Sequence, residues 1–138
     1  MVKTLGNPDC HVVLRGSSHG PNYDAASVAK AMDTIRAEMP ADSAAAHGLI
    51  VDCSHGNSGK DEHRQAQVVR DIAGRIAKGE QGITGIMMES FIEGGNQKAA
   101  PIDQLVYGKS ITDKCLSWNT TEQLLRELAH AVAARRWK

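Results

Sequence analysis

The sequence predicts an α/β fold built on a parallel sheet. Three short, continuous apolar runs are rich in Val, Ile or Met, which is typical of strands buried on both faces. They lie at His11–Leu14, Gly48–Cys53 and Gly82–Met88. After each run come a polar loop and a segment with helical periodicity. Because strands and helices alternate, we expect the strands to run parallel and the helices to cover them.

The first helix is predicted from Asp24 to Met39. Its apolar residues recur at spacings of four, three and four, which places them on one helical face. They are Val28, Met32, Ile35 and Met39. Pro40 follows directly and ends the helix, because proline has no N–H to donate.

Two further helices follow the second and third apolar runs. The second is predicted at about Lys60–Lys78, with Ser58 and Asp61 as its capping pair. The third is predicted at about Thr120–Arg136, with Asn119 and Glu122 as its capping pair. Apolar residues recur at helical spacing in both segments, which indicates a buried face on each.

The composition is that of an ordinary globular domain. The chain has 138 residues, a net charge of zero and 23% charged residues, so we expect no nucleic-acid partner. It contains neither an apolar stretch of membrane-spanning length nor a signal-peptide core. Its three cysteines are far apart and odd in number, which favours a reducing cytoplasm over a disulfide framework.

Three strand–helix units are too few to close a (β/α)8 barrel, which needs eight. Both edges of the predicted sheet would be unpaired, and apolar strand edges invite association. We therefore expect the chain either to form a homo-oligomer through these edges or to be a piece of something larger.

A side chain that can bind a metal or an anion follows each apolar run. Arg15 comes after the first run, His55 after the second and Glu89 after the third. Ligands bind at the carboxyl ends of strands in parallel α/β folds, so these side chains should meet at one end of the sheet. Imidazole and carboxylate suit a divalent metal, a guanidinium suits a phosphate or carboxylate, and Asp113 offers a third metal ligand.

Strand alternation gives a second expectation. Side chains alternate between the two faces of a strand. If Arg15, His55 and Glu89 point to a barrel interior, the strand residues at alternate positions before them should share that face and should be apolar or small. That set is Val13, Val51, Cys53, Gly85 and Met87, whereas Ile50 and Ile86 would face the helices.

Each candidate also has an ordinary structural interpretation. Arg15 is compatible with a surface salt bridge, His55 with a hydrogen-bonded loop histidine, and Glu89 with a solvated carboxylate. Asp113 is compatible with a helix N-terminal carboxylate. Their equivalent places on successive units favour a site for a metal and an anion. Cys10 and Cys53 are interpreted as packing residues.

Six motifs, in order, resemble the 3-deoxy-D-arabino-heptulosonate 7-phosphate (DAHP) synthases of the feedback-regulated microbial type. They are "HVVLRG" with "GPNYD", "VDCSHGNSGK", "GIMMES" with "EGGNQ", and "YGKSITDKC". The resemblance extends from Cys10 to Arg136 and corresponds to about the last three units of an aldolase-type (β/α)8 TIM barrel. It implies that residues 1–138 form a single partial barrel domain, an incomplete barrel.

The resemblance implies a metal-dependent transferase. These enzymes condense phosphoenolpyruvate with erythrose 4-phosphate, the first step of the shikimate pathway to aromatic amino acids. By this resemblance His55, Glu89 and Asp113 are ligands of a divalent metal (Mn, Fe, Co or Zn), and Arg15 binds the phosphate of phosphoenolpyruvate. No catalytic residue is assigned, and Lys109 and Ser110 lie in a matching motif without an assigned role.

The family's cysteine ligand, and the lysine and further arginines of its phosphoenolpyruvate site, come from the start of the barrel and have no counterpart here. We therefore expect a DAHP synthase fragment that is inactive alone and binds metal weakly. The alternatives are a stand-alone, non-catalytic α/β module that self-associates, and an unrelated metal-dependent hydrolase using His55, Glu89 and Asp113.

Overall fold

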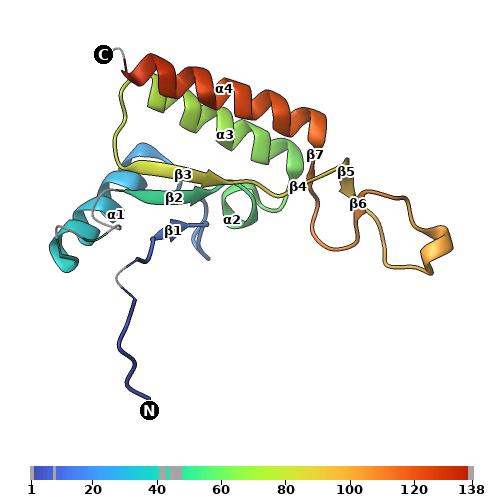
Figure 1. The fold of residues 1–138 in the computed structure, drawn as a ribbon, viewed down its shortest axis with the longest axis horizontal. Helices are drawn as coiled ribbons and strands as arrows, with labels where there is room; N and C mark the ends of the chain where they lie inside the picture. The colour runs from blue at the N-terminus through green and yellow to red at the C-terminus, as the bar shows by residue number, and fades with distance from the viewer. Residues whose placement is uncertain (1, 8, 41–42, 44–47, 137–138) are drawn as a thin grey trace.

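A computed structural model gives the fold of the chain (Figure 1) and describes residues 2–7, 9–40, 43 and 48–136. The elements in chain order are β1 (Val13–Leu14), α1 (Ala25–Glu38), β2 (Leu49–Asp52), α2 (His55–Ser58), α3 (Glu62–Ala77), β3 (Ile83–Met87), β4 (Ser90–Phe91), β5 (Glu93–Asn96), the 3-10 helix η2 (Ile102–Gln104), β6 (Lys109–Ser110), β7 (Leu116–Ser117) and α4 (Trp118–Arg136).

The central sheet is parallel, as predicted. Its order is β1-β2-β3, with Leu14 opposite Val51 and Val51 opposite Ile86. The register shifts between Leu49 and Ile50, which places one extra residue in β3. All three strands fall inside the predicted apolar runs. Their carboxyl ends therefore lie together, which is the condition for the expected site.

One face of the sheet packs against the helices. Leu49, Val51 and Cys53 are fully buried and share a core with residues of α1, α3 and α4, including Val28, Ile72 and Leu124. Helices α3 and α4 lie side by side over this face (Figure 1). Removal of this apolar surface from water is the main stabilisation of the fold, at about 25 cal/mol per Å².

The alternation prediction is wrong for β2. Val51 and Cys53 face the helices, whereas their neighbour Ile50 is only partly buried. The prediction extended the strand pattern as far as His55. That residue already belongs to α2, so its side-chain direction does not follow the two-residue period of β2. On the other strands the prediction agrees: Val13 and Met87 are each 42% exposed, and Ile86 packs on the helix-side core.

Helix α1 begins and ends where the sequence places it. Asp24 is the N-cap, and its carboxylate accepts a hydrogen bond from the N–H of Ser27. Met39 is the C-cap, directly before Pro40.

The two predicted capping pairs are wrong. Asp61 itself caps α3 by accepting from the N–H of Arg64, whereas Ser58 belongs to α2 and donates to the carbonyl of Ser54. Helix α4 begins at Trp118, and the hydroxyl of Ser117 accepts from the N–H of Thr120. In both cases the helix uses the acceptor nearest to its actual first turn.

An extended segment between β3 and α4 was not predicted. Two small parallel pairs form there, β4 with β7 and β5 with β6. The segment that carries η2 projects from the end of the sheet (Figure 1), and its return through β6 brings Cys115 against Gly95 of β5. None of the helices in the described part of the chain has the length and hydropathy of a membrane-spanning segment.

Candidate metal centre

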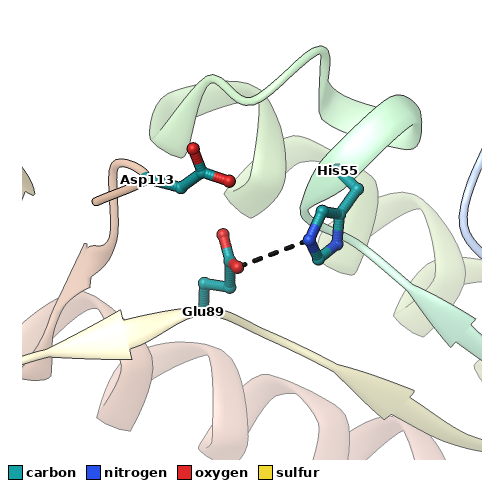
Figure 2. Close-up of side chains that lie close together, drawn as sticks. All are labelled: His55, Glu89 and Asp113. Carbon is teal, nitrogen blue, oxygen red and sulfur yellow. Dashed lines mark ion pairs between the residues drawn. The ribbon is translucent and has the colours of Figure 1, made fainter.

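Three of the four predicted site residues converge. One ligand atom from each of His55, Glu89 and Asp113 lies within 4.8 Å of the other two. His55 Nε2 lies 3.6 Å from Glu89 Oε1. Figure 2 shows the imidazole and the two carboxylates pointing toward a common space from three separate segments of the chain.

The positions of these residues follow from the ends of the strands. His55 is the first residue of α2, which begins three residues after β2 ends, and Glu89 lies between β3 and β4. The N–H of Glu89 donates to Oε1 of the buried Gln65 at 2.7 Å, so α3 fixes the backbone at this point. Asp113 lies between β6 and β7, on the returning arm of the extended segment.

A buried carboxylate orients the imidazole of His55. Oδ2 of Asp52 lies 2.6 Å from His55 Nδ1, and the Asp52 side chain is fully buried. The other oxygen, Oδ1, accepts from the N–H of Ser54 at 2.8 Å. A carboxylate on one ring nitrogen fixes the tautomer and leaves the second nitrogen as a ligand atom. Here the second nitrogen, Nε2, is the one that faces Glu89.

The fourth predicted residue, Arg15, lies next to the same carboxylate. Its Nε is 3.8 Å from Asp52 Oδ2, and its side chain is 59% exposed. Asp52 therefore links the guanidinium to the imidazole of His55. This arrangement leaves the rest of the guanidinium open to an anion from solution.

Two glycines hold the loop of Arg15 against that of His55. The N–H of Gly56 donates to the carbonyl of Arg15 at 3.0 Å, and a Cβ on Gly16 would lie 2.5 Å from the carbonyl carbon of Gly56. Gly16 also has φ +82°, a conformation that favours glycine. Only glycine at this position permits both the approach and the backbone angle.

Asn57 adds a polar bridge between the strands. Its amide donates to the carbonyls of Leu14 and Asp52, at 3.0 and 2.8 Å, and its Oδ1 accepts from the N–H of Asn22. Because Asn57 is buried, these bonds fix the spacing of β1 and β2 at the site.

Two cysteines, Cys53 and Cys115, lie near the cluster, and both thiols have raised pKa values. Burial raises the pKa of Cys53 to about 12, and the charge of Asp52 adds to the effect, so this thiol is an inert packing residue, as predicted. Cys115 lies closer to the site, with its Sγ 3.6 Å from the carbonyl oxygen of Asp113. Burial raises the pKa of Cys115 as well. A hydrogen bond from Ser110 lowers the pKa of this thiol, and the charges of Glu89 and Asp113 raise it further.

The donor set suits a divalent cation of borderline hardness. One imidazole nitrogen and two carboxylates match the ligands preferred by Zn, Mn, Fe or Co. A metal-bound histidine usually has its other ring nitrogen held by a carboxylate, as Asp52 holds Nδ1 of His55. The described residues therefore fit a divalent-metal site with three protein ligands.

Sequence reasoning missed the supporting residues Asp52, Asn57, Lys60 and Gln65. For Asp52 a signal was present: it precedes His55 by three residues, immediately where the apolar run ends. No such signal exists for Gln65 or Lys60, whose partners Glu89 and Asp113 are distant in the sequence.

Fold and site together define a parallel α/β protein with a candidate divalent-metal centre at the carboxyl ends of its strands. The profile of the DAHP synthetase I family matches residues 1–126. The chain therefore belongs to this family.

The curated relatives carry matching names. A phospho-2-dehydro-3-deoxyheptonate aldolase of Corynebacterium glutamicum is 46% identical, and the match covers 99% of this chain and 37% of the relative. The Phe-sensitive enzyme of that name from Escherichia coli K12 is 44% identical, with the same two shares. A tyrosine-inhibited enzyme of Schizosaccharomyces pombe is 45% identical, over 99% of this chain and 36% of the relative. The chain thus spans little more than a third of the length of these relatives.

The fold also has a solved counterpart. The structure of the phospho-2-dehydro-3-deoxyheptonate aldolase of Francisella tularensis SCHU S4 superposes with a TM-score of 0.84 at 39% identity. The match covers 96% of this chain and 37% of that one.

Proposed function

We propose that this chain forms the metal-binding part of a DAHP synthase active site. In that reaction the enol carbon of phosphoenolpyruvate attacks the aldehyde of erythrose 4-phosphate, water adds at the adjacent carbon, and inorganic phosphate leaves. The observation that carries the proposal is the convergence of His55, Glu89 and Asp113 within 4.8 Å, in a chain of this family.

The proposal assigns the metal to His55 Nε2 and to the carboxylates of Glu89 and Asp113. A bound divalent cation supplies Lewis acidity that polarises the aldehyde oxygen. Mn, Fe, Co and Zn all suit this donor set. We further propose that the three strand–helix units are the last of a (β/α)8 barrel and form one partial domain over residues 1–138.

The remaining side chains bind and orient. Asp52 accepts a hydrogen bond from the Nδ1–H of His55, which keeps Nε2 free as a ligand atom. Arg15 offers its exposed guanidinium to the phosphate of phosphoenolpyruvate, and its contact with Asp52 sets its distance from the metal ligands. Holding the two substrates in this fixed relation accounts for part of the rate enhancement.

Activity requires the rest of the barrel in this proposal. The purified chain would be assayed for phosphate release from phosphoenolpyruvate with erythrose 4-phosphate and Mn²⁺, first alone and then with the upstream region of a full-length relative. We expect no turnover alone and measurable turnover in the mixture. Turnover by the chain alone at the rate of a complete enzyme would disprove the need for upstream residues.

A substitution pair tests the metal assignment in the same assay. Glu89→Gln removes a ligand charge and should abolish turnover in the mixture and weaken Mn²⁺ binding by the chain. Glu93→Gln changes an exposed carboxylate of β5 outside the cluster and should leave both unchanged. Equal effects of the two substitutions would contradict the assignment.

We also propose that the chain forms a homo-oligomer. The sheet face away from the helices exposes Val13 and Met87, each at 42%, and exposed apolar strand surface favours association. Light scattering after size exclusion should give a dimer or larger species, whereas a monomer at high concentration would exclude it. The proposed compartment is the reducing cytoplasm, in keeping with the free thiols of Cys10, Cys53 and Cys115.

A further inference from the structure

Lys60 makes an ion pair with one of the three converging residues. Its ammonium nitrogen lies 3.0 Å from Oδ2 and 3.2 Å from Oδ1 of Asp113. The two residues are 53 positions apart in the chain, and both side chains are partly exposed, at 62% for Lys60 and 39% for Asp113. Lys60 therefore occupies both oxygens of a carboxylate that faces His55 and Glu89.

The backbone of Lys60 is strained. Its φ is +60°, and among the described non-glycine residues it is alone in having a positive φ. A side chain with a Cβ adopts this left-handed conformation at a cost, and such strain often marks a functional position. The preceding Gly59 is also left-handed, at φ +64°.

The strained turn is tied directly to the candidate site. The N–H of Lys60 donates to the carbonyl of His55 at 2.9 Å, which closes the turn of α2. The same residue therefore contacts the backbone of one converging residue and the side chain of another. This double attachment fixes where the ammonium lies relative to Asp113.

We propose that Lys60 is a positioning residue whose ammonium acts as an internal competitor of the divalent metal at Asp113. The inference rests on the proposed metal role of His55, Glu89 and Asp113. An ammonium and a divalent cation on one carboxylate repel each other, so metal binding must weaken or displace the Lys60 pair. Lys60 thereby holds Asp113 in place before metal binds and lowers the affinity of the site.

Mn²⁺ titration of the purified chain, followed by electron paramagnetic resonance, tests the proposal. Lys60→Met removes the ammonium and should tighten Mn²⁺ binding by about 1.5-fold to fivefold, the range expected for loss of one exposed ion pair. Lys60→Arg keeps the charge and should bind Mn²⁺ like the wild type. Lys30→Met makes the same charge change on α1, away from the site (Figure 1), and should have no effect.

Lys60→Gly is a second variant that removes the ammonium while relieving the strained φ, so it should fold well and bind Mn²⁺ as tightly as Lys60→Met. Unchanged or weaker Mn²⁺ binding in folded Lys60→Met and Lys60→Gly would overturn the proposal. If Glu89→Gln still weakens Mn²⁺ binding in that case, the metal site stands and only the role of Lys60 fails. Absence of Mn²⁺ binding in the wild type and in all three Lys60 variants would overturn both proposals.

Discussion

The carboxylate of Asp52 lies 2.6 Å from Nδ1 of His55 and 3.8 Å from Nε of Arg15, so one fully buried side chain touches both a candidate metal ligand and a candidate anion-binding residue. Asp52 stands at the end of β2, the middle strand of the sheet. The contact couples the orientation of the imidazole to the position of the guanidinium.

Asp52→Asn should weaken Mn²⁺ binding by about 10-fold to 100-fold, because the contact that orients His55 loses its charge. Titration of the purified chain measures this. Asp33→Asn, an exposed carboxylate of α1 whose nearest cation is Arg36 at 4.0 Å, is the matched control and should have no effect. Equal Mn²⁺ affinities for Asp52→Asn and wild type would show that the contact does not prepare the ligand.

Gly16→Ala should lower the free energy of unfolding by about 2–4 kcal/mol, through steric overlap with Gly56 and the cost of φ +82°. Urea unfolding monitored by circular dichroism gives the value. Gly6→Ala introduces the same methyl group at φ +75° with nothing within 4 Å, so it isolates the backbone cost. A loss no greater than that of Gly6→Ala would mean that the close approach of the two loops is unimportant.

Gln65→Ala should cost about 1–3 kcal/mol of unfolding free energy, since it removes the acceptor for the N–H of Glu89 and leaves that donor unpaired. Gln67→Ala, on the exposed side of the same helix, serves as the control. Hydrogen exchange at the Glu89 amide is the local readout, and unchanged protection in Gln65→Ala would refute the assignment.

The N-cap carboxylate of Asp24 should make the free energy of unfolding fall at acidic pH. Hydrogen bonds from the hydroxyl and the N–H of Ser27 lower its pKa below the ordinary 3.8. A carboxyl with a lowered folded-state pKa contributes stability above its unfolded pKa, and that stability is lost as pH falls through the folded value.

Asp24→Ala should therefore cost about 1 kcal/mol at pH 7, the usual value of an N-cap, and less below pH ~3. Asp24→Asn keeps a capping oxygen without the titration and should remove the pH dependence. Thermal unfolding at several pH values compares the three proteins. An Asp24→Ala deficit that stays constant from pH 7 to pH ~2 would contradict this account.

The sequence was sufficient to predict most of the regular structure. Apolar runs and helical periodicity predicted the three strands of the sheet and the three long helices, because burial against one core imposes those patterns locally. The sequence patterns did not predict the N-cap residues correctly. Ser58 and Asn119 are favourable N-cap residue types, but both lie inside helices. The choice of cap depends on where the first turn forms, which the residue type alone does not fix.

The candidate site was predictable only in outline. Arg15, His55 and Glu89 follow strand ends directly, so a parallel sheet alone requires them to lie near one another. Asp113 follows no strand of the central sheet, and its place in the cluster depends on the return of the chain through β6. The motif resemblance indicated Asp113, whereas the periodicity of the chain did not.

The sequence by itself determined the elements, their order and the residue types available for metal and anion binding, because these depend on neighbours within a few positions. Only the tertiary structure decided which partners those residues meet: Asp52 on His55, Gln65 beneath Glu89 and Lys60 on Asp113. The last two contacts join residues 24 and 53 positions apart, and the packing of helices on the sheet, rather than any local pattern, sets their distances.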